Sequence, residues 1–126
     1  MASAFAPSFK ELLLGGGISL TADTIGVALL DNTYVFSSVH DFRNDLTGVV
    51  ALSSSLASKT ITSGVFDAAD GLASSVTGNA IVAVWLFKST GVASTDPLIV
   101  FIDGLSLTPN GNNINIIWNA SGIFAL

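Results

Sequence analysis

The sequence predicts an all-β fold, an antiparallel β-sandwich of about seven strands with one short N-terminal helix. Short runs rich in β-branched and aliphatic residues recur from Ile18 onward, and Gly, Ser, Asn and Pro separate them. Only one segment, near the N-terminus, repeats apolar residues at helical spacing. Two later runs are apolar at nearly every position, which is typical of strands buried on both faces. A partly open barrel of similar strand content is the alternative.

The helix is predicted over Ala4–Leu14, because Pro7 suits a first helical turn. The glycines at 15–17 end it, and they allow it either to pack on its own domain or to reach a neighbouring subunit. Residues 1–17 are therefore expected to form a helix and a glycine linker on a single domain of residues 1–126. The apolar residues that recur every three or four positions are Phe5, Phe9, Leu12 and Leu13.

The first strong strand is predicted over Thr24–Asp31, which is rich in aliphatic residues. A turn at Asp31 and Asn32 then leads to an extended stretch over Thr33–Phe36. The more polar segment His40–Leu46 is a connection with room for one helical turn. Weaker strands are expected at Gly48–Leu52, Lys59–Ser63 and Leu72–Val76.

The two strongest strands are predicted at Ala80–Lys88 and Pro97–Asp103, joined by a hairpin loop. A turn at Pro109-Asn110-Gly111 then leads into a closing strand over Asn112–Trp118, since Asn-Gly accepts the positive φ angles of a tight turn. In that strand we expect Ile114, Ile116 and Trp118 to face the core. A neighbouring subunit is expected to cover Ile117 and Ile123–Leu126.

The composition favours a subunit of an assembly. Half of the 126 residues are hydrophobic and only 10% are charged, against about 25% charged in an average soluble domain. The net charge is -5, and the four basic residues are scattered, so we expect neither nucleic acid nor an anionic membrane as a partner. With no basic stretch before an apolar run, we expect no secretory signal. We expect no cofactor.

The candidate catalytic group is the single histidine, His40, beside Asp41. Neighbouring side chains on an extended segment point to opposite sides, so Asp41 is badly placed to orient the imidazole. The chain also lacks a G-x-S-x-G motif, and we predict that it is not an enzyme. Four aspartates have a spacing that suits either a shared Ca²⁺ or local capping of backbone N–H groups, and we favour capping: Asp41, Asp45, Asp67 and Asp70.

The sequence resembles a family of small bacteriophage virion structural proteins. The similarity runs over nearly the whole chain and rests on "FKELLLGGGISLTADTIGVALLDNTYVFSSVHDFRNDL", "SKTITSGVFDAAD", "FKSTG", "DPLIVFID" and "LTPNGNNINIIWNASGIFAL". Gly48–Ser58 matches poorly, and Ser89 stands where an acidic residue is common. Some members of the family resemble head decoration (cement) proteins, and no catalytic residue transfers from the family.

The resemblance implies a homo-oligomer, expected to be a trimer, that is made in the host cytoplasm and sits on the virion capsid. There it would bind the phage major capsid protein and bridge neighbouring capsid subunits. A tail or baseplate structural protein and a receptor- or glycan-binding module are the alternatives. The residues predicted to form a subunit or capsid interface are Phe5, Phe9, Leu12, Leu13, Ile117, Trp118, Ile123, Phe124 and Leu126.

Overall fold

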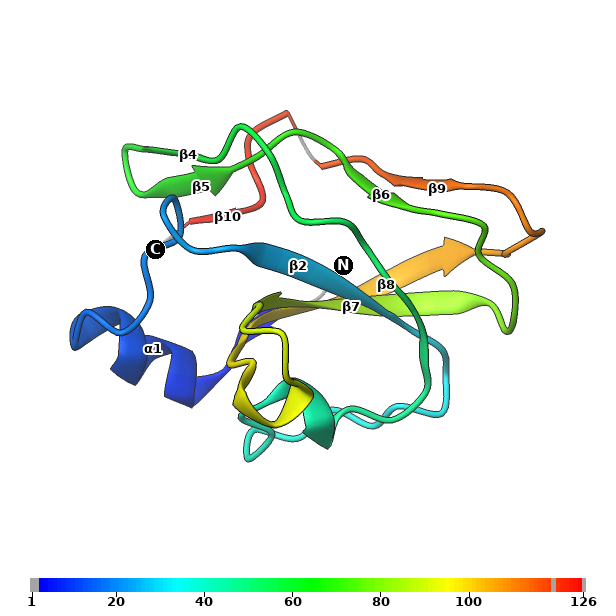
Figure 1. The fold of residues 1–126 in the computed structure, drawn as a ribbon, viewed down its shortest axis with the longest axis horizontal. Helices are drawn as coiled ribbons and strands as arrows, with labels where there is room; N and C mark the ends of the chain where they lie inside the picture. The colour runs from blue at the N-terminus through cyan, green and yellow to red at the C-terminus, as the bar shows by residue number, and fades with distance from the viewer. Residues whose placement is uncertain (1–2, 119, 126) are drawn as a thin grey trace.

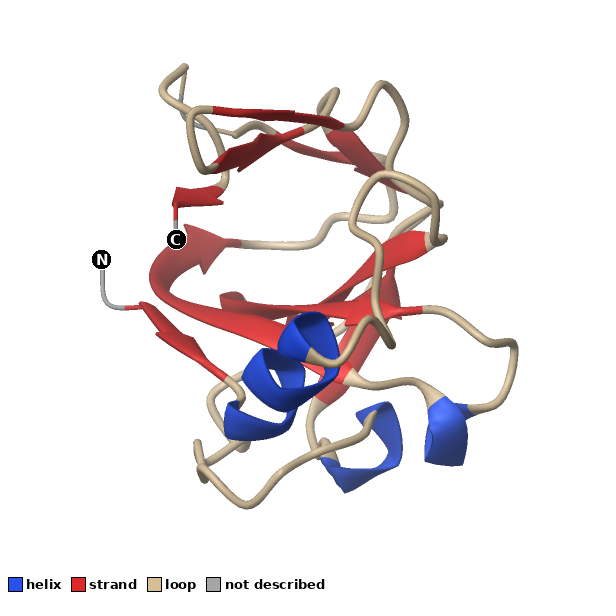
Figure 2. Cartoon of the chain, turned by 90° about the vertical axis from the view of Figure 1, so that its left-hand side faces the viewer, coloured by secondary structure: helices blue, strands red, loops and turns tan. Residues whose placement is uncertain are grey.

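The computed structural model describes residues 3–118 and 120–125, which form antiparallel β-sheets and one α-helix. The strands lie in two stacked layers, and the helix covers the outer side of the larger layer (Figure 2). The predicted mostly-β class with a short N-terminal helix is confirmed. None of the helices in the described residues is both long and apolar enough to span a membrane.

The larger layer is a five-stranded sheet with the order β1-β8-β7-β2-β3. Every neighbouring pair is antiparallel. Six of the eight residues in β7 are buried, as are Leu98–Val100 and Ile102 of β8, so the burial predicted for these two runs is confirmed. All six residues of β2 are buried as well. The strands are β1 (Ser3–Phe5), β2 (Ile25–Leu30), β3 (Val49–Leu52), β7 (Ile81–Lys88) and β8 (Leu98–Leu107).

The smaller layer consists of two short sheets with the orders β10-β5-β4 and β6-β9. Since β6 follows β5 along the chain and β10 follows β9, the two pairings form one antiparallel ribbon that residues 117–123 interrupt. Figure 1 shows this ribbon above the five-stranded sheet. The strands of the smaller layer are β4 (Thr60–Thr62), β5 (Val65–Asp67), β6 (Gly71–Ala73), β9 (Ile114–Ile116) and β10 (Phe124–Ala125).

Residues 53–57 connect the two layers along one side. The Ser53 amide donates to the Val27 carbonyl at 2.8 Å on β2, and the Ser54 amide donates to the Leu72 carbonyl at 2.8 Å on β6. This extended segment therefore satisfies backbone groups of both layers. Along this side, hydrogen bonds therefore join the two layers of the sandwich.

The helix α1 spans Pro7–Leu14, so the predicted start at Ala4 is wrong. Residues 3–5 instead form β1, which pairs with Val100–Ile102 of β8. Ala6 keeps an extended backbone (φ −64°, ψ 129°), because a residue that precedes proline avoids the helical region. Residues 3–5 are therefore extended because they pair with the edge of β8. The helical spacing of the side chains could not predict this pairing.

Other differences concern short segments. Residues 33–36 are a loop and not an extended strand, whereas β5 and β10 were not predicted. β8 runs on to Leu107, and β9 is shorter than predicted. The helical turn expected in the polar connection is present as the 3₁₀ helix η1 (Arg43–Asp45), and a second, η2 (Ala93–Thr95), lies in the β7–β8 hairpin loop.

Candidate interaction surfaces

Four phenylalanines join the two ends of the chain inside the protomer. The Phe5 ring lies 5.9 Å from Phe9 and 5.1 Å from Phe124, and the Phe124 ring lies 5.3 Å from Phe66. Phe9 and Phe66 are buried. Three of the predicted interface residues therefore pack within their own domain. The reason is that β10 pairs with β5, which places Phe124 opposite Phe66 instead of leaving it for a neighbour.

The helix packs on its own domain. Phe9 is fully buried, while Leu12 and Leu13 are partly buried against the core. Leu14 is the exception, because it is 89% exposed at the end of the helix. The prediction for Leu126 falls outside the described residues.

An aromatic cluster fills the space between the five-stranded sheet and the loop of residues 31–47. The indole Nε1 of buried Trp85 donates to the Tyr34 hydroxyl at 2.9 Å, and that hydroxyl lies 2.7 Å from His40 Nδ1. Phe36 stacks on Trp85 with an interplanar angle of 15°. Burial raises the pKa of Tyr34. The His40 ring is thus hydrogen-bonded to Tyr34, which the sequence analysis did not propose as its partner.

A buried ion pair holds the same loop to the β7–β8 hairpin. Arg43 Nε donates to Asp96 Oδ2 at 2.7 Å, and the Asp96 side chain is fully buried. Desolvation opposes ionisation of Asp96, but hydrogen bonds from the Thr90 amide and hydroxyl and from Arg43 outweigh it and lower the pKa of Asp96. The Arg43 guanidinium also lies 5.2 Å from the centre of the Phe87 ring.

The aspartates accept hydrogen bonds from backbone amides. Asp45 Oδ2 accepts from the amides of Asp41 at 2.9 Å and Phe42 at 3.1 Å, which lowers the pKa of Asp45. Asp67 accepts from the next amide along the chain, at 2.8 Å. Asp70 instead accepts from the distant Trp118 amide at 3.3 Å. In Asp41 it is the backbone carbonyl that accepts a hydrogen bond, from the Leu98 amide.

The loops beside the five-stranded sheet expose large apolar side chains. Residues 31–47 and 89–97, which we call the loop layer, lie below the five-stranded sheet in Figure 1. Val35 and Val39 are 77% and 76% exposed. Isolated exposed apolar residues are ordinary, but several within one layer are typical of a binding surface. We call this set the loop surface: Val35, Phe36, Val39, Phe42 and Val92.

A second apolar feature lies on the other side of the sheet, between the two layers. This interlayer cavity has a volume of about 260 Å³. Three of the predicted interface residues, Ile117, Trp118 and Ile123, line it, and Ile117 is 76% exposed. The predicted core direction of Ile114, Ile116 and Trp118 is confirmed, because all three pack against the core. The remaining lining residues are Val84, Ile102, Leu105, Ile116 and Gly122.

No protein-family model and no curated protein matches this chain.

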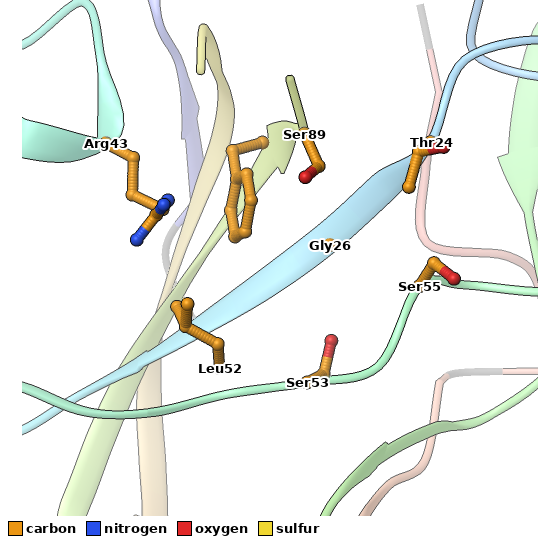
Figure 3. A pocket seen from close by; sticks show the side chains of 8 residues that line it. Thr24, Gly26, Arg43, Leu52, Ser53, Ser55 and Ser89 are labelled. Atoms are coloured by element: carbon orange, nitrogen blue, oxygen red, sulfur yellow. The ribbon is translucent and has the colours of Figure 1, made fainter. Parts of the chain in front are cut away.

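A hydroxyl-lined pocket lies at the edge of β2. Figure 3 shows Gly26 between Ser53 and Ser55 on one side and Arg43 and Ser89 on the other. Its volume is about 130 Å³, well below the roughly 300–1,000 Å³ of ordinary small-molecule sites. Arg43 is also already paired with Asp96. This pocket gives little support to a glycan-binding site.

Proposed function

We propose that this chain is a bacteriophage virion structural protein, specifically a capsid decoration (cement) protein. It binds the outer shell and stabilises the head by bridging major capsid subunits. The observation that carries the proposal is the presence of two separate apolar surfaces, the loop surface and the interlayer cavity, on a chain in which only 10% of the residues are charged. The resemblance to phage virion proteins supports the same conclusion.

Two separate surfaces suit a protein that makes two kinds of contact. The loop layer lies on one side of the five-stranded sheet and the smaller layer lies on the other (Figures 1 and 2). The loop surface belongs to the loop layer, whereas the cavity is lined by residues of the sheet and of the segment 116–123. One surface is therefore available for the shell while the other binds a different partner. We assign the loop surface to the shell, because binding residues are commonly carried on loops that a rigid scaffold positions.

The loop surface is held rigid before it binds. The Arg43–Asp96 pair and the hydrogen bond from Trp85 to Tyr34 fasten the loop layer to the sheet. A preorganised surface loses less conformational entropy on association. Burying one large apolar side chain contributes about 1.5–3 kcal/mol, so a few such contacts per subunit, repeated over a shell, stabilise the assembled head by mass action.

The proposal is tested with shells that lack the protein. Purified protein is added to heads from a phage in which its gene is deleted, and bound copies and heat resistance of the heads are measured. We expect binding and a rise in the temperature at which the heads open. Val35→Asp should weaken binding, whereas Ile61→Asp, at an exposed position on β4, should not.

The copy number separates the head from the tail. Hundreds of copies over the shell support decoration, whereas a handful at one vertex or at the tail tip would contradict it and favour the tail or baseplate alternative. Shells that bind the protein without gaining heat resistance would also contradict a cementing role.

A further inference from the structure

We infer that the interlayer cavity is the site at which two copies of this chain associate, with Ile117 of one copy inserted into the cavity of the other. The inference deepens the proposed function and rests on it for its purpose, since a decoration protein that binds its own kind bridges more of the shell. The contact itself requires no shell. The shape of this face, its low charge and the hydrogen bonds that hold it support this contact.

The face places an apolar knob at the rim of an apolar hole. Ile117 is 76% exposed, although it borders a cavity lined by aliphatic side chains and Trp118. An interface between identical subunits needs a feature on one copy that is complementary to a feature on the other. An exposed Ile117 beside the cavity meets that requirement, because each copy supplies one knob and one hole.

The volume is adequate for the insertion. An apolar cavity of about 150 Å³ already binds benzene. The interlayer cavity measures about 260 Å³, so a branched aliphatic side chain fits. Water in such a cavity finds few hydrogen-bond partners, and its replacement by an isoleucine side chain is favourable.

The lack of charged residues in the segment 104–125 favours a second copy as the occupant. The chain carries a net charge of -5, which makes most of its surfaces repel one another. Residues 104–125 contain no charged residue and no histidine, so this face can meet its own copy without like charges from that segment.

The wall of the cavity is held in place. The Trp118 amide donates to Asp70, its indole Nε1 donates to the Ala69 carbonyl at 3.2 Å, and the Ile123 amide donates to the Phe66 carbonyl at 2.8 Å. These bonds fasten both ends of the loop that interrupts the ribbon. The cavity is consequently preformed, which favours association.

The adjacent strand edge adds backbone groups to the contact. β1 pairs with β8 only over Val100–Ile102. In the described residues, the next stretch of β8, which includes the cavity residue Leu105, therefore has a partner strand on one side only. Such an edge is available to a second chain.

The first test is the mass of the purified protein in solution, without shells. We expect light scattering to give a multiple of the chain mass at micromolar concentration, and Ile117→Asp to weaken association at least about tenfold. Val39→Asp is the matched control, because Val39 is also 76% exposed but lies on the loop surface. A monomeric wild-type protein, or equal effects of the two variants, would overturn the inference.

A second test locates the contact, and it is clean because the chain has no cysteine. Ile117→Cys is mixed with a longer, tagged copy carrying Leu105→Cys under mild oxidation. We expect a disulfide between the two chains, and none when Val39→Cys replaces Ile117→Cys. Failure of this cross-link, with shell binding intact, would overturn the inference and leave the decoration role standing. Loss of shell binding with the cross-link formed would contradict the decoration role and leave the inference standing.

Discussion

Arg43 Nε lies 2.7 Å from Asp96 Oδ2, and the carboxylate is fully buried while the arginine side chain is 21% exposed. This pair joins η1 to the hairpin loop that contains η2 and thus fastens the loop layer. A buried carboxylate that loses its cation retains the cost of desolvation. The order of the proposed shell-binding surface therefore depends on this contact.

Arg43→Met should lower the free energy of unfolding by about 3 kcal/mol, the lower end of the range for breaking a buried pair, because both hydrogen bonds from Thr90 to Asp96 remain. Lys88→Met is the control, since the Lys88–Asp23 pair is 3.3 Å long and about one quarter exposed. It should cost less than about 1 kcal/mol. Urea denaturation measures both values, and equal losses would contradict the assigned role of the Arg43–Asp96 pair.

Acid should destabilise the protein. The pKa values of Asp31, Asp45 and Asp96 lie below their ordinary value of 3.8 in the folded chain, for Asp31 chiefly because the Thr33 hydroxyl donates to it. As the pH falls, these carboxyls take up protons in the unfolded chain first, so protons favour unfolding. The free energy of unfolding should be level above about pH 5 and fall as the pH drops through 4. Unfolding curves that coincide at pH 6 and pH 3 would refute this.

The helix should contribute to stability through one face only. Phe9→Ala removes a fully buried ring from the phenylalanine cluster and should cost about 3–5 kcal/mol. Leu14→Ala, five residues further along the same helix, should change the free energy of unfolding by less than about 0.5 kcal/mol. Thermal denaturation compares the two. Similar small effects would mean that the helix does not dock on its own domain.

Tyr34→Phe should leave the buried indole N–H of Trp85 without its acceptor. The expected loss is about 1–3 kcal/mol of unfolding free energy. In a Trp85→Phe background the same substitution should cost clearly less, because the donor is already gone. Denaturation of the four proteins of this double-mutant cycle measures the coupling. A coupling energy of zero would show that the hydrogen bond contributes nothing.

The sequence predicted those parts of the fold whose pattern reflects burial. β7 and the first half of β8 are nearly continuous apolar runs, and burial on both faces follows from that pattern. β1 and β10 were missed, because each is two or three residues long and owes its conformation to a partner strand that is distant in the sequence. Tertiary pairing of this kind leaves almost no local signal.

The candidate surfaces were predictable to a similar extent. Alternation along the closing strand correctly directed Trp118 inward and left Ile117 outside. It could not show that Phe124 finds Phe66 within the same chain, since hydrophobicity does not specify a partner. The Arg43–Asp96 pair joins residues 53 positions apart, and only the folded chain brings them together.

Under the proposed function, a reconstruction of the phage virion tests the central claim most directly. The decoration account predicts copies of this fold over the whole outer shell, with the loop surface against the major capsid protein. Density for this fold confined to the tail or baseplate, or a virion that lacks the chain altogether, would contradict it.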